Sequence, residues 1–143
     1  MASPRNPHPN AHPLAGAHSN APQVAAQLNA RAAAALPAVA SVVQHYAMLL
    51  ETAVKVQASG RPGPNAPTGD YRRSWTHEFS ISGMNAEAIV GTNKPQGRRL
   101  EYGFVGADIL GRIYNQPPFP HVGPAVEEIR PLFLAAVGAA VGD

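Results

Sequence analysis

The side chains able to do acid–base, nucleophilic or metal chemistry are few in this chain of 143 residues and are spread along it. There is no cysteine, which excludes thiol nucleophiles, disulfides, zinc–thiolate sites and iron–sulfur clusters. The carboxylates form no pair at a spacing typical of a catalytic or metal site. They are Glu51, Asp70, Glu78, Glu87, Glu101, Asp108, Glu127, Glu128 and Asp143. The sequence therefore predicts a protein that is not an enzyme and holds no cofactor or metal.

The histidines and the glycine-rich loop do not change this prediction. His8, His12 and His18 are irregularly spaced among prolines, which favours a solvated arm over a metal site. His77, on the apolar face of an expected strand, and His121, among prolines, are interpreted as structural residues. Residues 60–69 contain several glycines but no Walker lysine, and they follow a helix instead of a strand, so they do not predict a phosphate loop.

The arginines offer a second kind of chemistry, since nine Arg against two Lys favour planar, bidentate contacts with carboxylate or phosphate. They cluster in loops: Arg61, Arg72 and Arg73 flank a Thr-Gly turn, and Arg98 and Arg99 close the next loop. One interpretation is contact with a DNA backbone. The other is a solvated loop or a salt bridge to a neighbouring subunit, for example to Glu101 or Glu128. Contact with protein is favoured over DNA, because DNA-binding proteins usually carry a denser basic stripe.

Hydrophobic periodicity predicts the elements that must position these side chains. A narrow apolar face predicts a helix from about residue 20, interrupted at Pro37 and followed by a longer helix that ends at Gly60. Alternation over 75–81, a turn at 82–85 and a second alternating run over 86–92 predict an antiparallel hairpin.

The last third of the chain gives weaker signals. Residues 93–99 read as a polar loop, 100–105 as a short strand or a turn of helix, and 106–123 as an extended loop stiffened by prolines. Pro124 is expected to open a C-terminal helix with Glu127 and Glu128 in its first turn, and Pro131 to kink or end its first segment.

These elements predict an α+β fold in which a long N-terminal helix and a C-terminal helix pack on a small antiparallel β-sheet. We expect a single domain over residues 22–143 and an extended or disordered arm over 1–21. The arm is rich in Pro, Ala, Asn and His, and we expect it to become ordered only against a neighbouring subunit or protein.

Composition adds that the core should be thin, because 45% of residues are hydrophobic but many are alanine and only 6% are aromatic. A thin core favours a subunit that buries apolar surface against neighbours. Net charge is modest at +2, with 14% charged residues. No apolar run approaches the roughly 18 residues of a membrane span, and there is no secretory signal, so we expect a soluble intracellular protein that does not enter a membrane.

Three short motifs in a fixed order carry a resemblance to a known family. The first is a Pro-Thr-Gly-x-hydrophobic-Arg-x-Ser element, the second a Glu-aromatic-Gly element, and the third a Pro-Pro-Phe element with a Pro-Ala that starts the final helix. Their residues here are Pro67, Thr68, Gly69, Tyr71, Arg72, Ser74, Glu101, Tyr102, Gly103, Pro117, Pro118, Phe119, Pro124 and Ala125. Over residues 35–140 the chain resembles the small head–tail joining (neck or tail-completion) proteins of long-tailed double-stranded DNA bacteriophages. It departs from them after Gly103, where residues 104–116 replace a short threonine-containing loop.

The resemblance implies a structural virion protein of the head–tail connector, assembled in the bacterial cytoplasm as a homo-oligomeric ring. Its partners would be other neck and tail proteins, such as a head-completion protein and a tail terminator, and DNA would pass through the ring without sequence-specific binding. Alternatives are a tail terminator that caps the tail tube and, in a different class, a small nucleic-acid-binding protein that uses its arginine loops. The expected subunit or partner contacts are Arg61, Thr68, Gly69, Arg72, Arg73, Arg98, Arg99, Glu101 and Phe119.

The first motif also has a local structural interpretation. Thr68 is expected to cap a single helical turn, with Gly69 allowing the tight entry and Tyr71 packing inward. That turn would aim Arg72 and Arg73 outward, while Trp75 anchors the first strand in the core.

Overall fold

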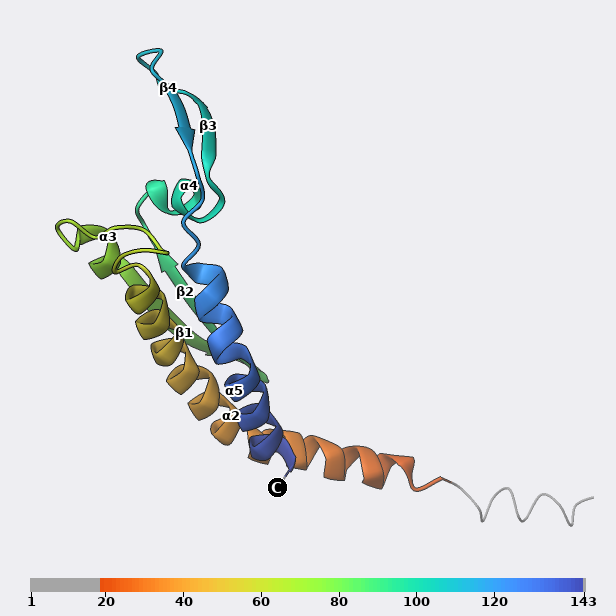
Figure 1. Cartoon of the computed structure of the whole chain (residues 1–143). Helices are drawn as coiled ribbons and strands as arrows, with labels where there is room; N and C mark the ends of the chain where they lie inside the picture. Colours follow the sequence, from red (N-terminus) through yellow and green to blue (C-terminus); the bar gives the residue numbers. More distant parts are fainter. Residues whose placement is uncertain (1–18, 143) are drawn as a thin grey trace, which may run out of the picture. The chain divides into compact units, whose positions relative to one another are not determined.

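The computed structural model describes residues 19–142 (Figure 1). Residues 1–18 lie outside the described part, and with them most of the expected arm and its three histidines. The chain divides into two units, Met1–Ala34 and Ala35–Asp143, and the division falls inside the first helix. The described residues of the first unit, 19–34, are all exposed.

The described chain is α+β, as predicted from its periodicity. In place of one sheet it has two antiparallel sheets of two strands each, β1–β2 and β3–β4. In chain order the elements are α2 (Ala21–Gln57), α3 (Asp70–Arg73), β1 (Trp75–Ser82), β2 (Asn85–Thr92), α4 (Gln96–Tyr102), β3 (Phe104–Ala107), β4 (Ile113–Gln116) and α5 (Val122–Gly142).

Helix α2 runs without a break through Pro37, so the predicted interruption there is wrong. Proline removes one helical N–H, which leaves the carbonyl four residues earlier without its usual donor. That carbonyl belongs to Ala33, and both Ala33 and Pro37 are exposed, so water can supply the missing bond. Flanking alanines, the best helix formers, favour continuation on both sides.

The hairpin over residues 75–92 is confirmed. Its register pairs Trp75 with Thr92 and Phe79 with Ala88. Burial alternates along the first part of β1, where Trp75 is buried, Thr76 is exposed and His77 is half-buried.

Two elements between residues 96 and 116 differ from the expected loops. Helix α4 begins in the predicted polar loop. Its end and the start of β3 lie in residues 100–105, where a short strand or a turn of helix was expected, and the rest of β3 and β4 form a second hairpin where an extended loop was expected. The carboxylate of Asp108 closes the hairpin loop, because it accepts bonds from the backbone N–H groups of Leu110 and Arg112 and from the Arg112 guanidinium. Gly111 follows at φ 78°, a conformation that favours glycine.

Helix α5 begins at Val122, two residues before Pro124, and continues through Pro131 without a break. Pro124 thus lies in the first turn, where its missing N–H costs nothing. The carbonyl that faces Pro131 is that of Glu127, and both residues are exposed, so the predicted interruption fails here for the same reason as at Pro37. Glu127 and Glu128 do not lie in the first turn.

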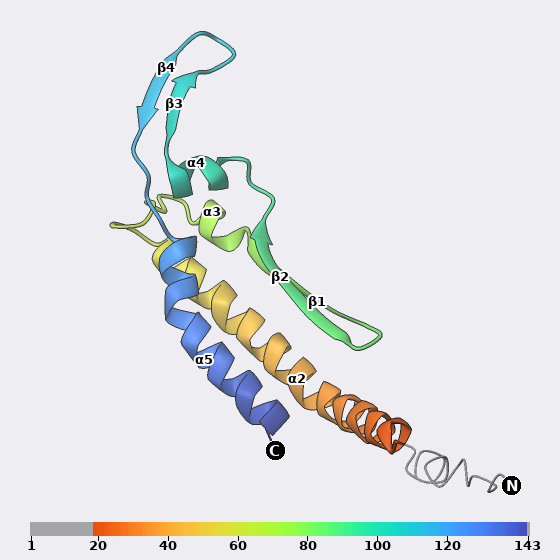
Figure 2. The ribbon, with the colours of Figure 1, turned by 90° about the vertical axis from the view of Figure 1, so that its right-hand side faces the viewer.

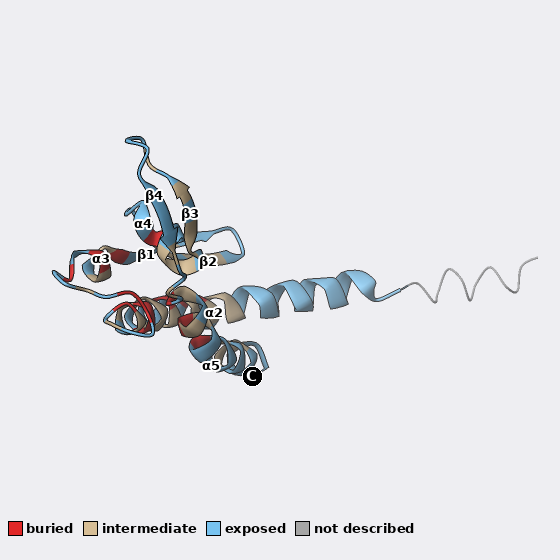
Figure 3. Cartoon of the chain, turned by 45° about the horizontal axis from the view of Figure 1, so that its top comes forward, coloured by how far each residue is buried: buried red, intermediate tan, exposed pale blue. Residues whose placement is uncertain are grey.

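The core is thin, as the composition predicted. Its central cluster joins α2, α3, β1 and α5 through Ala53, Val54, Ala58, Tyr71, Trp75, Ala125 and Ile129. Figures 1 and 2 show α5 beside the C-terminal part of α2, with β1 and β2 next to them. Figure 3 shows how few residues are buried. Many large apolar side chains consequently remain exposed in the described subunit.

Candidate functional site

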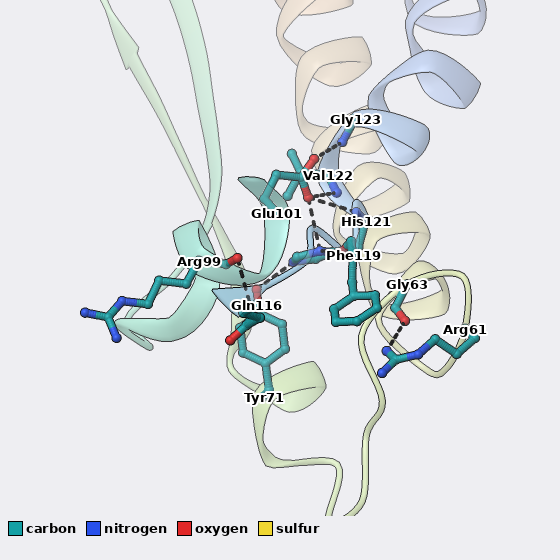
Figure 4. Close-up of polar contacts among 10 residues, drawn as sticks. All are labelled: Arg61, Gly63, Tyr71, Arg99, Glu101, Gln116, Phe119, His121, Val122 and Gly123. Atoms are coloured by element: carbon teal, nitrogen blue, oxygen red, sulfur yellow. Dashed lines mark hydrogen bonds and ion pairs between the residues drawn. The ribbon is translucent and has the colours of Figure 1, made fainter. Parts of the chain in front are cut away.

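The three motifs, far apart in sequence, meet at one place. We call this place the junction and define it by Tyr71, Trp75, Glu101, Phe119 and His121. Figure 4 shows the end of α4 facing the start of α5, with Tyr71 reaching toward them from α3. The junction joins α3 and the start of β1 to the end of α4 and to the segment that enters α5.

Glu101 joins the end of α4 to the start of α5. Its carboxylate accepts backbone hydrogen bonds from His121 at 2.8 Å, Val122 at 2.9 Å and Gly123 at 2.9 Å (Figure 4). The next residue is Pro124, which has no N–H, so the free donors at the start of α5 are all accounted for. A negative charge at this end also complements the helix dipole. Glu101 therefore supplies the capping charge that the sequence assigned to Glu127 and Glu128.

These contacts keep Glu101 ionised. Burial alone would raise its pKa, but the three backbone N–H groups and the nearby His121 ring outweigh burial, so the pKa of Glu101 lies below its ordinary value. Its side chain is only 11% exposed. Glu101 was expected to contact a partner. In the described subunit its carboxylate instead accepts hydrogen bonds from the backbone of its own chain.

His121 is completely buried and bonded at both ring nitrogens. Nδ1 lies 2.9 Å from the carbonyl oxygen of Phe119 and 3.0 Å from the Glu101 carboxylate, both of them acceptors. The proton therefore belongs on Nδ1, and Nε2 accepts the bond from the Tyr71 hydroxyl at 2.6 Å. The sequence interpretation of His121 as a structural residue fits this arrangement.

The turn around Thr68 enters a short helix through Gly69, as expected, but Thr68 does not cap that helix as predicted. Gly69 is the N-cap of α3 and takes a left-handed conformation with φ 79°. No N-cap side chain accepts a hydrogen bond from the first turn of α3. The Thr68 hydroxyl instead accepts a long bond of 3.3 Å from the backbone N–H of Asp70. Tyr71 is buried, as expected, and packs edge-on against Trp75.

Phe119 completes the junction. Its backbone N–H donates to the carbonyl of Leu100 at 2.6 Å, which holds the segment before α5 against α4. The guanidinium of Arg61 lies 3.7 Å from the centre of the Phe119 ring and also donates to the carbonyl of Gly63 at 2.9 Å. Arg61 and Phe119, both expected as partner contacts, therefore contact each other.

The other candidate arginines also lie against groups of the described chain, with one exception. Arg72 donates to the Ser59 hydroxyl at 3.2 Å, and Arg73 pairs with Asp70 at 2.6 Å. Arg99 stacks on the ring of Phe104, with 3.9 Å between the guanidinium carbon and the ring centre. Arg98 is exposed. The contacts of the other three are made to different parts of the described chain: the turn after α2 for Arg72, α3 itself for Arg73 and β3 for Arg99.

Side chains with metal or acid–base capacity are not gathered elsewhere in residues 19–142. That part of the chain holds no group of three or more His, Asp or Glu side chains able to bind a metal ion. His77 lies 3.3 Å from Glu51, a contact that links β1 to α2. Glu51 in turn lies 3.7 Å from Lys55 one helical turn later.

One property of helix α2 differs from the prediction that no apolar run approaches the length of a membrane span. By length and composition it could cross a membrane, and 11% of its most apolar 18-residue stretch is buried. Alanines and the near absence of charge before Glu51 produce this result. A core helix of a soluble protein can pass the same test, and the C-terminal part of α2 contributes Val54 to the core.

The hydrogen bonds of the junction hold α3, α4 and the start of α5 together. Glu101, His121 and Tyr71 stand in the order of an acid–histidine–hydroxyl relay, but His121 is fully buried and Tyr71 is 8% exposed. Burial raises the pKa of Tyr71, the neighbouring Trp75 side chain lowers it and the Glu101 charge raises it; the net pKa lies above its ordinary value, so the hydroxyl keeps its proton at neutral pH. The indole N–H of Trp75 is buried without a hydrogen-bond partner among residues 19–142.

Comparison with known proteins gives no relative to set beside this geometry. No protein-family model, no curated protein and no solved structure matches the chain.

Proposed function

We propose that the chain is a structural subunit of the head–tail connector, or neck, of a long-tailed bacteriophage. In this role it forms a homo-oligomeric ring that joins head-completion proteins to the tail and lets DNA pass through its centre. The subunit is not an enzyme; it assembles in the host cytoplasm and ends in the virion.

The observation that carries this proposal is the meeting of the three motifs. Gly69 sets the turn into α3, which carries Tyr71; Glu101 caps α5; and Phe119 bonds to the residue before Glu101. Motifs that occur together by chance have no reason to depend on one another in space. Here each one holds another in place, as the defining elements of one fold would.

The exposed apolar surface supports assembly. A monomer rarely leaves so many large apolar side chains in water unless another surface covers them. Those exposed here come from helices and strands alike and include Leu28, Met48, Val56, Ile81, Met84, Ile89, Val105, Ile109, Leu110, Ile113, Leu132 and Leu134.

The alternative of a nucleic-acid-binding protein has less support. Arg61, Arg73 and Arg99 engage rings or a carboxylate of the chain itself, which leaves fewer guanidinium groups for phosphates. A tail terminator would share the ring and the exposed apolar surface, and it differs only in the layer that the ring occupies.

Two measurements test the proposal. Light scattering and electron microscopy of the purified chain should show a ring with a central channel, formed in the absence of DNA. Duplex DNA titrated into the protein at several salt concentrations should bind weakly; tight binding with a steep salt dependence would favour the nucleic-acid alternative. Portal and major tail genes on either side of its gene would support the neck assignment, and a subunit that stays monomeric at high concentration would contradict it.

A further inference from the structure

The outer side of the β1–β2 hairpin carries two carboxylates around an exposed apolar side chain. The register places Glu78 opposite Ile89 and Glu87 opposite Ser80, so Glu78 and Glu87 are diagonal neighbours on one side of the hairpin. Both are exposed, and Ile89 beside them is 58% exposed. Neither carboxylate forms a salt bridge among residues 19–142. We call the surface formed by Glu78, Glu87 and Ile89 the acidic face.

The hairpin holds no cation that could offset these charges. Residues 75–92 contain no lysine or arginine. Their one histidine, His77, points to the opposite side of the hairpin, where it contacts Glu51. The exposed acids of α5 differ in this respect, because Glu127 and Arg130 are three residues apart on the same helix and so are neighbours on its surface. The acidic face therefore depends on a cation from elsewhere.

Helix α4 presents a surface of the opposite charge. Arg98 and Arg99 lie four and three residues before Tyr102, so the two guanidinium groups flank this ring on one side of the helix. All three residues are exposed, Tyr102 at 76%. Glu101, the one acid of α4, is taken up in the cap of α5. We call the surface formed by Arg98, Arg99 and Tyr102 the basic face.

The guanidinium groups of the basic face have no carboxylate partner in the described chain. Neither Arg98 nor Arg99 forms a salt bridge among residues 19–142. Arg99 lies over the ring of Phe104, and stacking of this kind leaves the N–H groups at the edge of the guanidinium able to bind a carboxylate. Tyrosine and arginine are also the residue types enriched at the centres of protein interfaces.

We infer that the basic face of one subunit binds the acidic face of the next subunit. In this contact two guanidinium groups meet two carboxylates, and Tyr102 packs against Ile89. Charge argues for a second copy as the partner, because every copy carries both faces and each face lacks a counter-charge from its own chain.

The contact requires two copies of the chain. In Figures 1 and 2 the turn of the β1–β2 hairpin points away from α4. A contact between different surfaces of identical subunits repeats from one copy to the next and closes into a ring if the rotation between copies allows. The inference thus rests on the proposed ring and specifies the contact that builds it.

Charge reversal in the purified full chain tests this contact. The basic-reversed variant carries Arg98→Glu and Arg99→Glu, and the acid-reversed variant carries Glu78→Lys and Glu87→Lys. The midpoint concentration for assembly of each should rise at least about tenfold, because like charges then face each other. Circular dichroism should show unchanged secondary structure in both.

Mixing the two reversed variants distinguishes a lost contact from a lost fold. Neither should assemble alone at the wild-type concentration, but the mixture should, because the acidic α4 of one variant then meets the basic hairpin of the other. A variant with all four substitutions should assemble alone with a midpoint within about threefold of the wild type, since both faces have exchanged sign.

The matched control carries Glu127→Lys and Glu128→Lys, which change the net charge as the acid-reversed variant does but lie on α5. It should assemble at the wild-type concentration. A control that fails as the acid-reversed variant does would overturn the inference, because net charge and not the acidic face would then govern assembly.

The remaining outcomes separate this inference from the proposed function. A wild-type protein that forms rings, together with reversed variants that assemble equally well, overturns the contact between the two faces and leaves the ring. Reversed variants that fail both alone and when mixed overturn it as well, since the two faces then do not meet. A basic-reversed variant that keeps its assembly but loses binding to duplex DNA assigns the basic face to nucleic acid instead. A wild-type protein that never associates overturns both.

Discussion

The side chains of Tyr71 and His121, fifty residues apart in the chain, meet inside the protein with 2.6 Å between the phenol oxygen and Nε2. Because the other ring nitrogen of His121 faces two acceptors, this bond is the one that satisfies Nε2. The contact ties α3 to the entrance of α5 and makes the first and third motifs parts of one structure.

Tyr71→Phe should destabilise the subunit by about 1 to 3 kcal/mol, since it leaves a buried ring nitrogen without a donor. Urea unfolding measures the change. Tyr102→Phe is the matched control, because Tyr102 is 76% exposed and should change stability by less than about 0.5 kcal/mol. Equal effects of the two substitutions would contradict the assigned bond.

Glu101→Gln should lower stability at neutral pH by about 1.5 to 3 kcal/mol, because hydrogen bonds to a charged acceptor are the stronger ones. The pKa of Glu101 is lower in the folded protein than its ordinary value. Its contribution is therefore fully present above the unfolded pKa, about 4.3, and is lost as the pH falls through the folded pKa.

The free energy of unfolding should therefore be measured from pH 7 to pH 3. The difference in this free energy between wild type and Glu101→Gln should shrink below about pH 4. Glu128→Gln, an exposed change on the same helix that Glu101 caps, should track the wild type. A gap that stays constant with pH would mean that Glu101 does not act through its charge.

Trp75→Ala should cost about 3 to 5 kcal/mol, because the side chain is buried in the central cluster. Trp75→Phe should cost clearly less, since it keeps an aromatic ring and removes an indole N–H that has no partner in the described chain. Thermal unfolding of both variants gives the comparison. A phenylalanine variant as unstable as the alanine variant would show that the N–H is satisfied, for example by water.

Gly103→Ala should destabilise the subunit. Gly103 has φ 82°, and an added Cβ would lie 2.9 Å from the carbonyl oxygen of Gln116 and 3.1 Å from the ring of Pro118. Strain of this kind costs on the order of 1 to 3 kcal/mol. Gly138→Ala is the control, because Gly138 lies in α5 and an added Cβ there meets no neighbouring atom. This substitution should stabilise the protein by about 0.5 to 1 kcal/mol, since alanine is the better helix former.

Long periodic segments were predictable from the sequence, and the reason is physical. Helix α2 and the β1–β2 hairpin each bury one face, so their apolar residues recur with the period of the element. The β3–β4 hairpin has four-residue strands and little burial on either face, so no period marks it. Its usable signal was Asp108 followed three residues later by Gly111, a typical turn pair.

Motif residues could be found in the sequence, but their contacts could not. Glu101 caps a helix that begins twenty-one residues later, and no local rule links a carboxylate to a helix end at that distance. The contact between Arg61 and Phe119 could not be predicted either. An arginine in a loop is equally consistent with a contact to a partner and with a cation–π contact to an aromatic ring of its own chain.

Trp75 is the chain's single tryptophan, and it lies edge-on to both Tyr71 and His121. The intrinsic indole emission of the protein thus comes from one fluorophore placed where the three motifs meet. Because the ring is inside the subunit, its emission maximum should shift to longer wavelength when the junction opens and stay constant when copies separate. Trp75 emission in denaturant then reports the unfolding of the junction on the unlabelled protein, and it does so without a contribution from changes in association.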